Sequence, residues 1–291
     1  MRILRLRAHA KINLYLDVLN LRDDGYHEIQ TLMQSIALSD DLQIIPHSST
    51  IEIHCDHPEL ANSEDNLAFK AAELLKDQTG IDKGVRIELN KRIPLGAGLA
   101  GGSADAAAVL TGLNKLWDLD LSLAQLQLLG AQLGSDVPFC LQGGTFWAEG
   151  RGEKLKEVNQ FPEASIVIAA PNFSLSTAKI YGKWDEIGTR TNIDRSRLMK
   201  SMQAGDLGEA CSYLANALEE VVFRSYPEVR ELKSKSLEAG ALGSLMSGSG
   251  PCVFSITESP KQAKKIATAL SKFCSVFITS TAKKGIEIVG N

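Results

Sequence analysis

The chain has 291 residues, 44% of them hydrophobic, which is enough for about two domains of ordinary size, each with its own core. Its 31 basic and 35 acidic side chains leave a net charge of -4, so it lacks the basic excess that binds a nucleic-acid backbone. No apolar run approaches the roughly 18 residues that span a bilayer, and residues 1–19 lack the apolar segment of a secretory signal. We therefore expect a soluble cytoplasmic protein whose partners are small molecules, with no nucleic acid and no membrane among them.

The first ninety residues are rich in strand patterns separated by turn signals, and helical patterns become frequent after them. The elements predicted here are strands at 3–17, 28–38, 41–46 and 50–55, a helix from Asn66 to about Gln78, a strand at 84–90, helices at 103–117 and 122–133, and a hairpin within 143–156. Helices follow strands without strict alternation, which favours an α+β sandwich of helices on a mixed sheet over a doubly wound parallel sheet.

The second half is again a mixture of helices and strands, after a crossing that we place near residues 155–165. We accordingly predict two domains, residues 1–158 and 159–291. The elements predicted in the second are a strand at 165–169, helices at about 176–185, 194–203, 206–223 and 227–239, strands at 242–247 and 252–257, a helix at 259–271 and a strand at 274–279.

Cysteine and histidine usage predicts no metal or disulfide site. The five cysteines are scattered and contain no C-x-x-C pair, so we expect reduced, mostly buried thiols. The segment His54–His57 gathers three types of metal ligand. A strand explains it more simply, because Ile51, Ile53 and Cys55 fall on one face and Pro58 ends the run.

The strand from Ala8 to Asp17 carries polar side chains along one face. Its apolar residues alternate with His9, Lys11, Asn13 and Tyr15, so these four side chains project the same way. The pattern alone is typical of the solvent-facing side of a half-buried strand. An ammonium beside an amide, as at Lys11 and Asn13, also suits a site that handles phosphate or a polar hydroxyl.

A glycine-rich segment, PLGAGLAGGS from Pro94 to Ser103, directly precedes an Ala-rich helix that Ser103 could cap and Asp105 could enter. Glycines leave backbone amides unhindered, and a helix N-terminus adds favourable partial charge for an anion. We therefore expect a phosphate-binding loop, although a structural loop that needs positive φ angles would also use glycine.

Three common phosphate-binding frameworks do not fit this loop. GAGLAG matches the dinucleotide fingerprint, but residues 91–94 separate it from the preceding strand, and the acidic candidates Asp118 and Asp120 lie between two helices. The H-R-D and D-F-G segments of protein kinases are absent, as is the G-K-[ST] of a Walker A loop. We therefore still predict a phosphate-binding loop, but one that belongs to none of these three frameworks.

Two more segments combine glycine with polar side chains. Asp136 follows a helix and precedes an apolar run with Pro138, which we predict to be a strand. Its carboxylate could accept a proton from an alcohol, or it could bind local amides as an Asx-type turn residue. The second segment, Ser247–Pro251, lies between two predicted strands, where a hairpin loop is the simplest interpretation.

Together these segments resemble the GHMP kinase superfamily, which groups galactose, homoserine, mevalonate and phosphomevalonate kinases. The segments that carry the resemblance stretch from residue 8 to residue 254. They are AHAKINLYLDVLNLRDDGYHEIQTLMQSIALSDDL, IPLGAGLAGGSADAAAVL, LGSDVPFCLQGGTFWAEGRGE and MSGSGPCVF. The combination of AKINL with DGYHE narrows the match to kinases that phosphorylate a cytidine diphosphate-linked polyol.

The resemblance implies a two-domain fold, an N-terminal α/β sandwich like domain 2 of ribosomal protein S5 and a C-terminal ferredoxin-like α+β domain. ATP and the acceptor would bind between the domains, and the γ-phosphoryl group would pass to a hydroxyl of the acceptor. The family's catalytic pair falls on Lys11 and Asp136. Asp136 would orient or deprotonate the hydroxyl, while Lys11 would lower the charge near it and hold the carboxylate ionised. Mg²⁺ is expected, coordinated mainly through the ATP phosphates.

The ATP-binding loop of the family falls on residues 94–104, and Asn66 matches a position used near the adenine. Amides from Gly96 to Ser103 would surround the phosphates, and the Ser103 hydroxyl could assist the triphosphate or its magnesium. The family often has a second serine where this chain has Ala104, so no side-chain role is expected there. The implied loop residues are Pro94, Leu95, Gly96, Ala97, Gly98, Leu99, Ala100, Gly101, Gly102, Ser103 and Ala104.

For the cytosine of the acceptor, the family pattern points to Tyr26 and His27, with His27 bonding the base edge and Tyr181 stacking on the ring. Tyr26 could instead close the turn after Gly25, and Tyr181 could be a core residue at helical spacing. The resemblance assigns further acceptor-binding residues, the last three of them near the diphosphate. They are Asn13, Thr177, Gly248, Ser249 and Gly250.

Two other functions are compatible with the same fold. Another GHMP kinase, such as homoserine kinase, acts on an amino acid, which offers no base for Tyr26 and His27 to bind. A non-catalytic binding module has no need for both Lys11 and Asp136. The oligomeric state stays open, because no symmetric apolar stripe stands out in the sequence.

Overall fold

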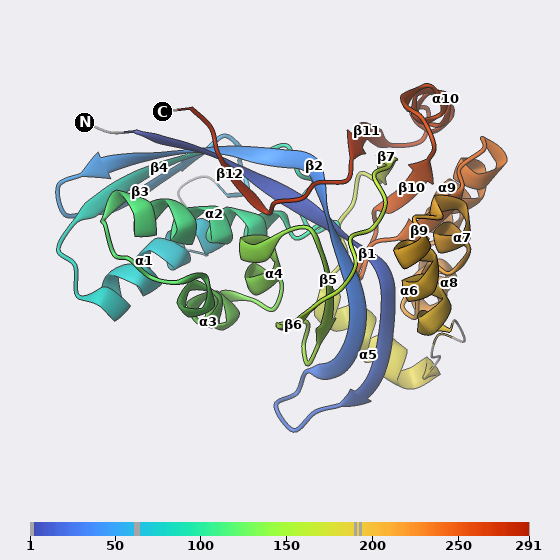
Figure 1. Cartoon of the computed structure of the whole chain (residues 1–291), viewed down its shortest axis with the longest axis horizontal. Coiled ribbons are helices and arrows are strands. Elements are labelled where there is room, and N and C mark those ends of the chain that lie inside the picture. The colour runs from blue at the N-terminus through green and yellow to red at the C-terminus, as the bar shows by residue number, and fades with distance from the viewer. Residues whose placement is uncertain (1–2, 61–64, 189–190, 192–193, 291) are drawn as a thin grey trace.

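The structure, a computed structural model, describes residues 3–60, 65–188, 191 and 194–290. Two sheets organise these residues, one in each half of the chain, and helices pack against both (Figure 1). This α+β architecture is the one predicted from the order of helices and strands. The cleft described below lies where the two halves meet.

A long antiparallel hairpin, β1 (Leu4–Leu21) and β2 (His27–His47), is the centre of the first sheet. Its pairing shifts register between His9 and Lys11 and again between Asn13 and Tyr15. Such bulges re-aim side chains and are common beside functional sites. The order of the sheet is β12-β1-β2-β4-β3, while β5 pairs with β2 and β6, and β8 pairs with β1. These further strands are β3 (Ile51–Cys55), β4 (Gly84–Asn90), β5 (Thr145–Glu149), β6 (Lys154–Glu157), β8 (Ala215–Asn216) and β12 (Ile286–Ile288).

Four helices pack beneath this sheet in Figure 1. They are α1 (Leu67–Thr79), α2 (Gly101–Leu116), α3 (Leu123–Leu133) and α4 (Val137–Gln142). The central helix, α2, contacts β1, β2, α1, α3 and α4, and it is buried without interruption from Ala104 to Leu110. Its alanines let the other elements approach closely, which explains why an Ala-rich helix occupies the middle of the layer.

The second sheet has the order β11-β7-β10-β9, and all its pairs are antiparallel. Its strands are β7 (Ser165–Ala170), β9 (Gly243–Met246), β10 (Val253–Thr257) and β11 (Ser275–Ser280). Helices α9 and α10 pack on it, and the others of this half lie around it. These helices are α5 (Thr177–Ile187), α6 (Arg195–Ala204), α7 (Leu207–Ser212), α8 (Glu219–Ser225), α9 (Pro227–Glu238) and α10 (Pro260–Leu270).

Two strands from the second half join the first sheet. β8 pairs in parallel with β1 at Tyr15 and Leu16, and β12 pairs antiparallel with β1 at residues 6–8. The described residues near the two ends of the chain therefore lie side by side, at β1 and β12 in Figure 1. The boundary at residues 158 and 159 stays a prediction.

The predicted break between strands at 28–38 and 41–46 is wrong, because β2 runs through it. Ser39, Asp40 and Asp41 have the composition of a turn. Asp40 is instead fully buried, where its carboxylate binds the ammonium of Lys91 and the N–H groups of Arg92 and Ile93. Because these partners, distant in sequence, satisfy the Asp40 carboxylate, the residue can be buried within a continuous strand and not in a turn.

Three further expectations are corrected. Residues 137–142 form α4 and not a strand, because Pro138 stands in the first helical turn, where proline fits. The helix expected at 206–223 is broken by β8, whose Asn216 amide binds the carbonyls of Met246 and Gly248. Helix α2 begins at Gly101, before Ser103, and its N-cap residue Ala100 has a left-handed backbone with no side-chain cap.

All five cysteines are free, and Cys140, Cys211 and Cys252 are buried, as expected of structural thiols. Residues 51–55 form the predicted strand β3, with Ile53 in the core. No helix within the described ranges is both long and apolar enough to cross a membrane.

Candidate active site

A cleft of about 810 Å³ lies between the first sheet, the glycine-rich loop and helix α5. Its volume is in the usual range for small-molecule sites. Most of the residues singled out in the sequence line it, namely Lys11, Asn13, Tyr26, His27, Pro94, Leu95, Gly96, Ala97, Gly98, Ala100, Gly101, Gly102, Ser103, Asp136, Thr177, Tyr181, Gly248 and Ser249. Four others lie behind its wall: Asn66, Leu99, Ala104 and Gly250.

The ammonium of Lys11 lies at the floor of this cleft. Its Nζ donates to the Asn13 Oδ1 at 2.7 Å and to the Gly98 carbonyl at 3.2 Å, and it lies 3.5 Å from the Asp136 Oδ2. The Lys11 side chain is only 5% exposed, so its strand face is not the ordinary solvent-facing side of a sheet. Because the Lys11 ammonium is buried, it has few possible partners other than these three groups and a ligand bound in the cleft.

The Asp136 carboxylate faces the cleft from the residue before α4. It makes no cap hydrogen bond to the helix, so the Asx-type turn considered above is not formed. Its side chain is 34% exposed, and its ion pair within the described residues is with Lys11. An ionised carboxylate with free lone pairs can accept a proton or a hydrogen bond from a bound hydroxyl.

The carbonyls of four successive loop residues are tied down on the protein side. Gly96 O accepts from the N–H of Leu175, Ala97 O from the N–H of Cys252, and Leu99 O from the N–H of Lys11. Gly98 O accepts from both the Ser247 hydroxyl and the Lys11 ammonium. With its carbonyls held from behind, the loop is rigid before any ligand arrives.

The N–H groups of the same loop are unused. In the part of the chain that the structure describes, the amides of Gly96, Gly98, Gly101, Gly102 and Ser103 have no hydrogen-bond partner. The last three are the first residues of α2, whose dipole adds positive partial charge at this end. A row of free donors at the start of a sixteen-residue helix is a ready anion site.

Gly98 is a loop position that only glycine fits. Its φ is +77°, and a Cβ built there would overlap the Ser247 carbonyl oxygen. The close approach brings the loop against the segment between β9 and β10, so that both line the cleft.

Asn66 stands beside the loop and outside the lining of the cleft. Its Oδ1 caps α1 by accepting from the N–H of Ala68 at 3.0 Å, while its Nδ2 is buried with no partner in the described ranges. Leu67, the next residue, packs near Gly102. The amide therefore holds an unused donor close to the first turn of α2.

A buried ionic cluster lies behind the loop. The Lys91 ammonium bridges Asp40 at 2.5 Å and Asp105 at 2.6 Å, and all three side chains are almost fully buried. The two carboxylates outweigh the effect of burial and raise the pKa of Lys91. Burial, reinforced by Asp40 and opposed by Lys91, raises the pKa of Asp105. This cluster ties the end of β4 to β2 and to α2, which fixes both ends of the glycine loop.

At the other end of the cleft, three side chains of α5 surround His27. The His27 Nε2 lies 2.7 Å from the Asp185 Oδ1, and its ring centroid lies 5.0 Å from that of Tyr181 and 5.8 Å from that of Trp184. Burial and, to a smaller extent, the Asp136 carboxylate raise the pKa of Tyr181, so this phenol stays neutral. Tyr181 is thus both a helix residue in contact with the core and a wall of the cleft.

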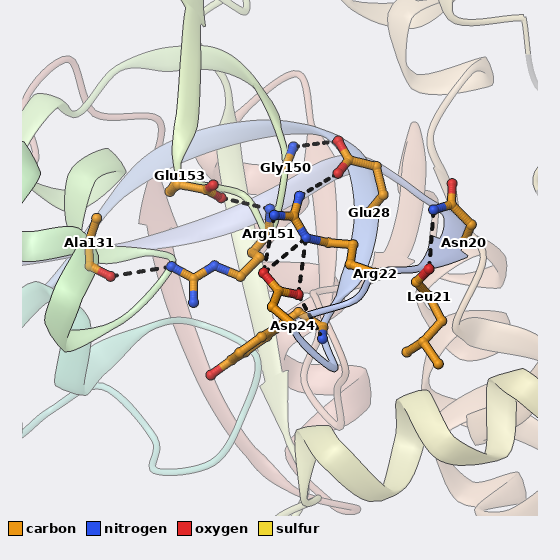
Figure 2. Close-up of polar contacts among 10 residues, drawn as sticks. Asn20, Leu21, Arg22, Asp24, Glu28, Ala131, Gly150, Arg151 and Glu153 are labelled. Carbon is orange, nitrogen blue, oxygen red and sulfur yellow. Dashed lines mark hydrogen bonds and ion pairs between the residues drawn. The ribbon is translucent and has the colours of Figure 1, made fainter.

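Figure 2 shows the polar network at the tip of the β1–β2 hairpin, next to this end of the cleft. Arg22 binds Asp24 and Glu28, and Glu28 also accepts from the N–H of Gly150, which joins the hairpin to the β5–β6 turn. Arg151 extends from that turn toward the carbonyl of Ala131, and its guanidinium lies 4.7 Å from the centre of the exposed Tyr26 ring. Tyr26 is therefore held by a cation rather than by the core.

The loop after β9 lies at the middle of the cleft. The Ser249 and Thr177 hydroxyls are 2.9 Å apart, so the loop is linked to the start of α5. A Cβ built on Gly248 would lie 3.4 Å from both the Lys11 Nζ and the Asn13 Oδ1. This segment is the hairpin loop expected from the sequence, and it also borders the Lys11 site.

Sequence reasoning missed two charged residues that line the cleft, Asp185 and Arg151. Asp185 lies one helical turn after Tyr181, so helical spacing offered a signal for it. Arg151 lies between Gly150 and Gly152 in a turn, where only the tertiary contact with Tyr26 reveals it.

No group of three or more His, Cys, Asp or Glu side chains that could hold a metal ion occurs within residues 3–60, 65–188, 191 and 194–290. Near the glycine loop, the cleft lining offers Mg²⁺ the Asp136 carboxylate and the Ser103 hydroxyl as oxygen donors. They are too few for a protein-built cage, so they fit an ion carried chiefly by a bound polyphosphate and water.

Two family models match the chain. Residues 66–144 match the GHMP kinases N terminal domain, and residues 198–276 match the GHMP kinases C terminal domain. The first covers the glycine loop and Asp136. The second runs from α6 to the start of β11 and includes the loop after β9.

Curated relatives similar to the chain over nearly its whole length are named 4-diphosphocytidyl-2-C-methyl-D-erythritol kinase. The protein of Acetivibrio thermocellus is 46% identical over 265 residues, which are 90% of this chain and 93% of the relative. That of Gloeobacter violaceus is 42% identical over 98% of this chain and 97% of its own. The protein of Caldanaerobacter subterraneus is 39% identical over 98% of this chain and 99% of the relative.

Solved structures agree with these relatives. A crystal structure of 4-(cytidine 5'-diphospho)-2C-methyl-D-erythritol kinase superposes with a TM-score of 0.83 at 35% identity, covering 96% of this chain and 99% of its own. A homoserine kinase from Cytophaga hutchinsonii superposes with a TM-score of 0.76 at 20% identity, covering 99% of this chain and 98% of its own. The latter shares the fold.

Proposed function

The chain belongs to the 4-diphosphocytidyl-2-C-methyl-D-erythritol kinases of the GHMP kinase family, and from this membership we propose that it transfers the γ-phosphoryl group of ATP to the 2-hydroxyl of 4-diphosphocytidyl-2-C-methyl-D-erythritol. It is an ATP-dependent small-molecule kinase of the non-mevalonate pathway to isoprenoid precursors. The observation that carries the proposal is the meeting of Lys11, Asp136 and the free amides of the glycine loop at one point of the cleft.

The loop amides would bind the phosphates of ATP. Phosphoryl transfer spreads negative charge over the equatorial oxygens, so donors that are already aimed and cost no reorganisation stabilise the transition state. The free N–H groups from Gly96 to Ser103 have this character, because the loop's carbonyls are held from behind. The unpartnered Nδ2 of Asn66, next to the same helix turn, is suited to an acceptor nitrogen of the adenine.

Asp136 would receive or orient the proton of the attacking hydroxyl, and Lys11 would stabilise negative charge beside it. Because the Lys11 Nζ lies 3.5 Å from the Asp136 Oδ2, both groups would lie next to the same acceptor oxygen of a bound substrate. Asn13 holds the Lys11 ammonium in this orientation through its Oδ1, while its own Nδ2 donates to Thr31. When bound with ATP, Mg²⁺ would neutralise phosphate charge, with the Ser103 hydroxyl and Asp136 as its candidate protein ligands.

The aromatic end of the cleft would hold the cytosine. Tyr26, His27 and Tyr181 supply ring faces and a hydrogen-bonding edge on the side away from the glycine loop. Thr177 and the loop from Gly248 to Gly250 lie between the two ends, where the diphosphate of an extended acceptor would pass. A homoserine molecule would leave this aromatic end empty, so homoserine is not the favoured acceptor. A cytoplasmic location stays a prediction.

The test is a coupled assay of ADP release with ATP, Mg²⁺ and the cytidyl methylerythritol as acceptor, with homoserine as the competing acceptor. We expect ADP release that depends on the cytidyl acceptor and product phosphorylated at the 2-hydroxyl. Equal turnover on homoserine would reject the assigned acceptor. Absence of transfer to any polyol, with tight binding of a macromolecular partner, would favour a non-catalytic module.

A further inference from the structure

The environment of His27 restricts the orientation of its ring. His27 is the first residue of β2 and its side chain is 7% exposed, and it packs against one face of α5. Tyr181 inclines over the ring at 33°, while the Trp184 ring meets it edge-on at 85°. Since residues 181, 184 and 185 are spaced three and four apart, they share that face of the helix. Two aromatic walls and one carboxylate therefore enclose the imidazole.

The carboxylate determines which ring nitrogen carries the proton. An ionised aspartate only accepts hydrogen bonds, so the 2.7 Å contact between the His27 Nε2 and the Asp185 Oδ1 requires a proton on Nε2. In the neutral imidazole the other nitrogen, Nδ1, is then a bare acceptor. Without the carboxylate either nitrogen could carry the proton, and a ligand would meet a mixture of the two tautomers of the imidazole.

The His27 Nδ1 is available to a ligand. It has no hydrogen-bond partner among the described residues, and it is absent from the fully buried polar atoms that lack partners. His9 differs, because both of its ring nitrogens are buried without a hydrogen-bond partner among the described residues, its Nε2 lies 3.5 Å from the Glu287 Oε2, and it is outside the cleft lining. His27 lines the cleft, so its free nitrogen is the one polar ring atom it can present there.

We propose that Asp185 is a positioning residue that holds His27 with its proton on Nε2, so that Nδ1 accepts a hydrogen bond from the exocyclic amine of cytosine. The proposal rests on the function proposed above, which puts a cytosine at this end of the cleft. Cytosine carries an amine donor at position 4, whereas uracil carries a carbonyl acceptor there. Two facing acceptors repel, and a buried polar group left unpaired is costly. Asp185 thereby makes the site selective for a cytidine over a uridine nucleotide.

A purely structural role for Asp185 predicts different behaviour. If the ion pair only fastened α5 to the hairpin, its loss would weaken all ligands in the cleft together. A positioning role alters the ratio between two bases that have the same shape and differ in donor pattern. The ratio, together with the protonated nitrogen of His27, separates the two roles.

The experiment compares wild type with Asp185→Ala, Asp185→Asn and Glu186→Ala. Glu186 is the matched control, an exposed acid on the same helix that does not line the cleft. Dissociation constants for cytidine 5′-diphosphate and uridine 5′-diphosphate are measured by calorimetry on the full chain, with a non-hydrolysable ATP analogue filling the other nucleotide site. The ¹⁵N resonances of the His27 ring, assigned with His27→Gln, report the protonated nitrogen.

We expect wild type and Glu186→Ala to bind the cytidine nucleotide about tenfold or more tightly than the uridine nucleotide, the effect of one well-placed hydrogen bond. Their His27 resonances should show a protonated Nε2 and a bare Nδ1. Asp185→Ala should lose most of this ratio and show mixed protonation. Asp185→Asn should keep much of both, because its amide oxygen can still accept from Nε2.

An unchanged ratio in Asp185→Ala, or a protonated Nδ1 in wild type, overturns the proposal. These readouts need no turnover, so they are independent of the assay for the proposed function. A wild type that selects the cytidine nucleotide but phosphorylates no cytidyl polyol would reject the function and keep the inference. A wild type that phosphorylates it, with an Asp185→Ala variant of unchanged base selectivity, would reject the inference alone.

Discussion

At the scale of single residues, Lys11 and Asp136 differ in how far their charged groups are exposed to the cleft. Lys11 is held by three oxygens in a nearly closed environment, whereas the Asp136 carboxylate is one-third exposed and directed into the cleft. A fixed cation next to a carboxylate that a substrate can reach is the arrangement expected when the carboxylate does the chemistry. In the proposed mechanism, Lys11 would supply positive charge that stabilises the transfer beside this carboxylate.

We predict that Asp136→Asn lowers kcat by about a hundredfold or more and changes the KM for ATP little, because the amide cannot accept the hydroxyl proton. Steady-state kinetics of ADP release would measure both constants. Asp77→Asn is the control, since Asp77 is an exposed acid on α1 far from the cleft lining. A near-wild-type kcat for Asp136→Asn would remove this residue from the mechanism.

The buried Asp105 predicts a pH effect on stability. Its pKa is raised by burial, so the folded protein favours the protonated acid more than the unfolded chain does. Its contribution to stability is complete below an unfolded aspartate's pKa of about 3.9, and it is lost as pH rises through the raised value in the folded protein. Asp105→Asn keeps the neutral form at every pH.

We therefore expect the free energy of unfolding of wild type, relative to that of Asp105→Asn, to fall as the pH rises from about 5 to about 9. Urea unfolding at several pH values measures this difference directly. A difference that grows with pH would contradict the assignment and would mean that the ionised Asp105 is the favoured partner of Lys91.

At the scale of elements, the conformation of the glycine loop depends on the segments that donate hydrogen bonds to its carbonyls. Strand β1 and the loop after β9 each donate to two of its carbonyls, and the segment after β7 donates to one, so the loop's conformation depends on three separate parts of the fold. The Asp40–Lys91–Asp105 cluster adds a fourth attachment at the end of β4. A loop restrained in this way offers its amides to a ligand with little loss of conformational entropy on binding.

Gly98→Ala should abolish tight ATP binding, because the added methyl overlaps the Ser247 carbonyl and the φ of +77° is strained for alanine. Calorimetric titration with a non-hydrolysable ATP analogue would measure the loss. Gly80→Ala is the matched control, since Gly80 also has a positive φ, +66°, and open space around its Cβ position. Equal affinity in the two variants would show that close packing of the loop is unimportant.

At the scale of the whole molecule, the end of the chain returns to support the site. β12 pairs with β1, and the carbonyl of Gly285 accepts from the N–H of His9 at 2.8 Å. A Cβ on Gly285 would overlap the carbonyl of Cys140, a residue of α4, so the chain end also packs on the helix that follows Asp136. Lys11 and Asp136, the proposed catalytic pair, are thus supported by elements from both ends of the sequence.

Ending the chain after Lys284 should lower the melting temperature by several degrees and reduce kcat, since the start of β1 becomes an edge and α4 loses its contacts with Gly285 and β12. Thermal unfolding and the ADP-release assay would test both. Ile288→Ala is a milder control, because its partly exposed side chain can be shortened without removing the strand. Unchanged stability and rate in the truncated chain would show that β12 is dispensable.

The sequence by itself determined most helices and strands and a set of residues that mostly meet in one cleft, and it predicted phosphate binding at the glycine segment. These follow from periodicity, glycine placement and short motifs, which are local properties of the chain. Tertiary structure alone decided the rest: that β2 continues through Asp40, that the carbonyls of residues 96–99 are all hydrogen-bonded, that Asp185 contacts His27, and that Arg151 contacts Tyr26. Each depends on a partner distant in the sequence, and burial with such a partner changes what a side chain does without changing the pattern around it.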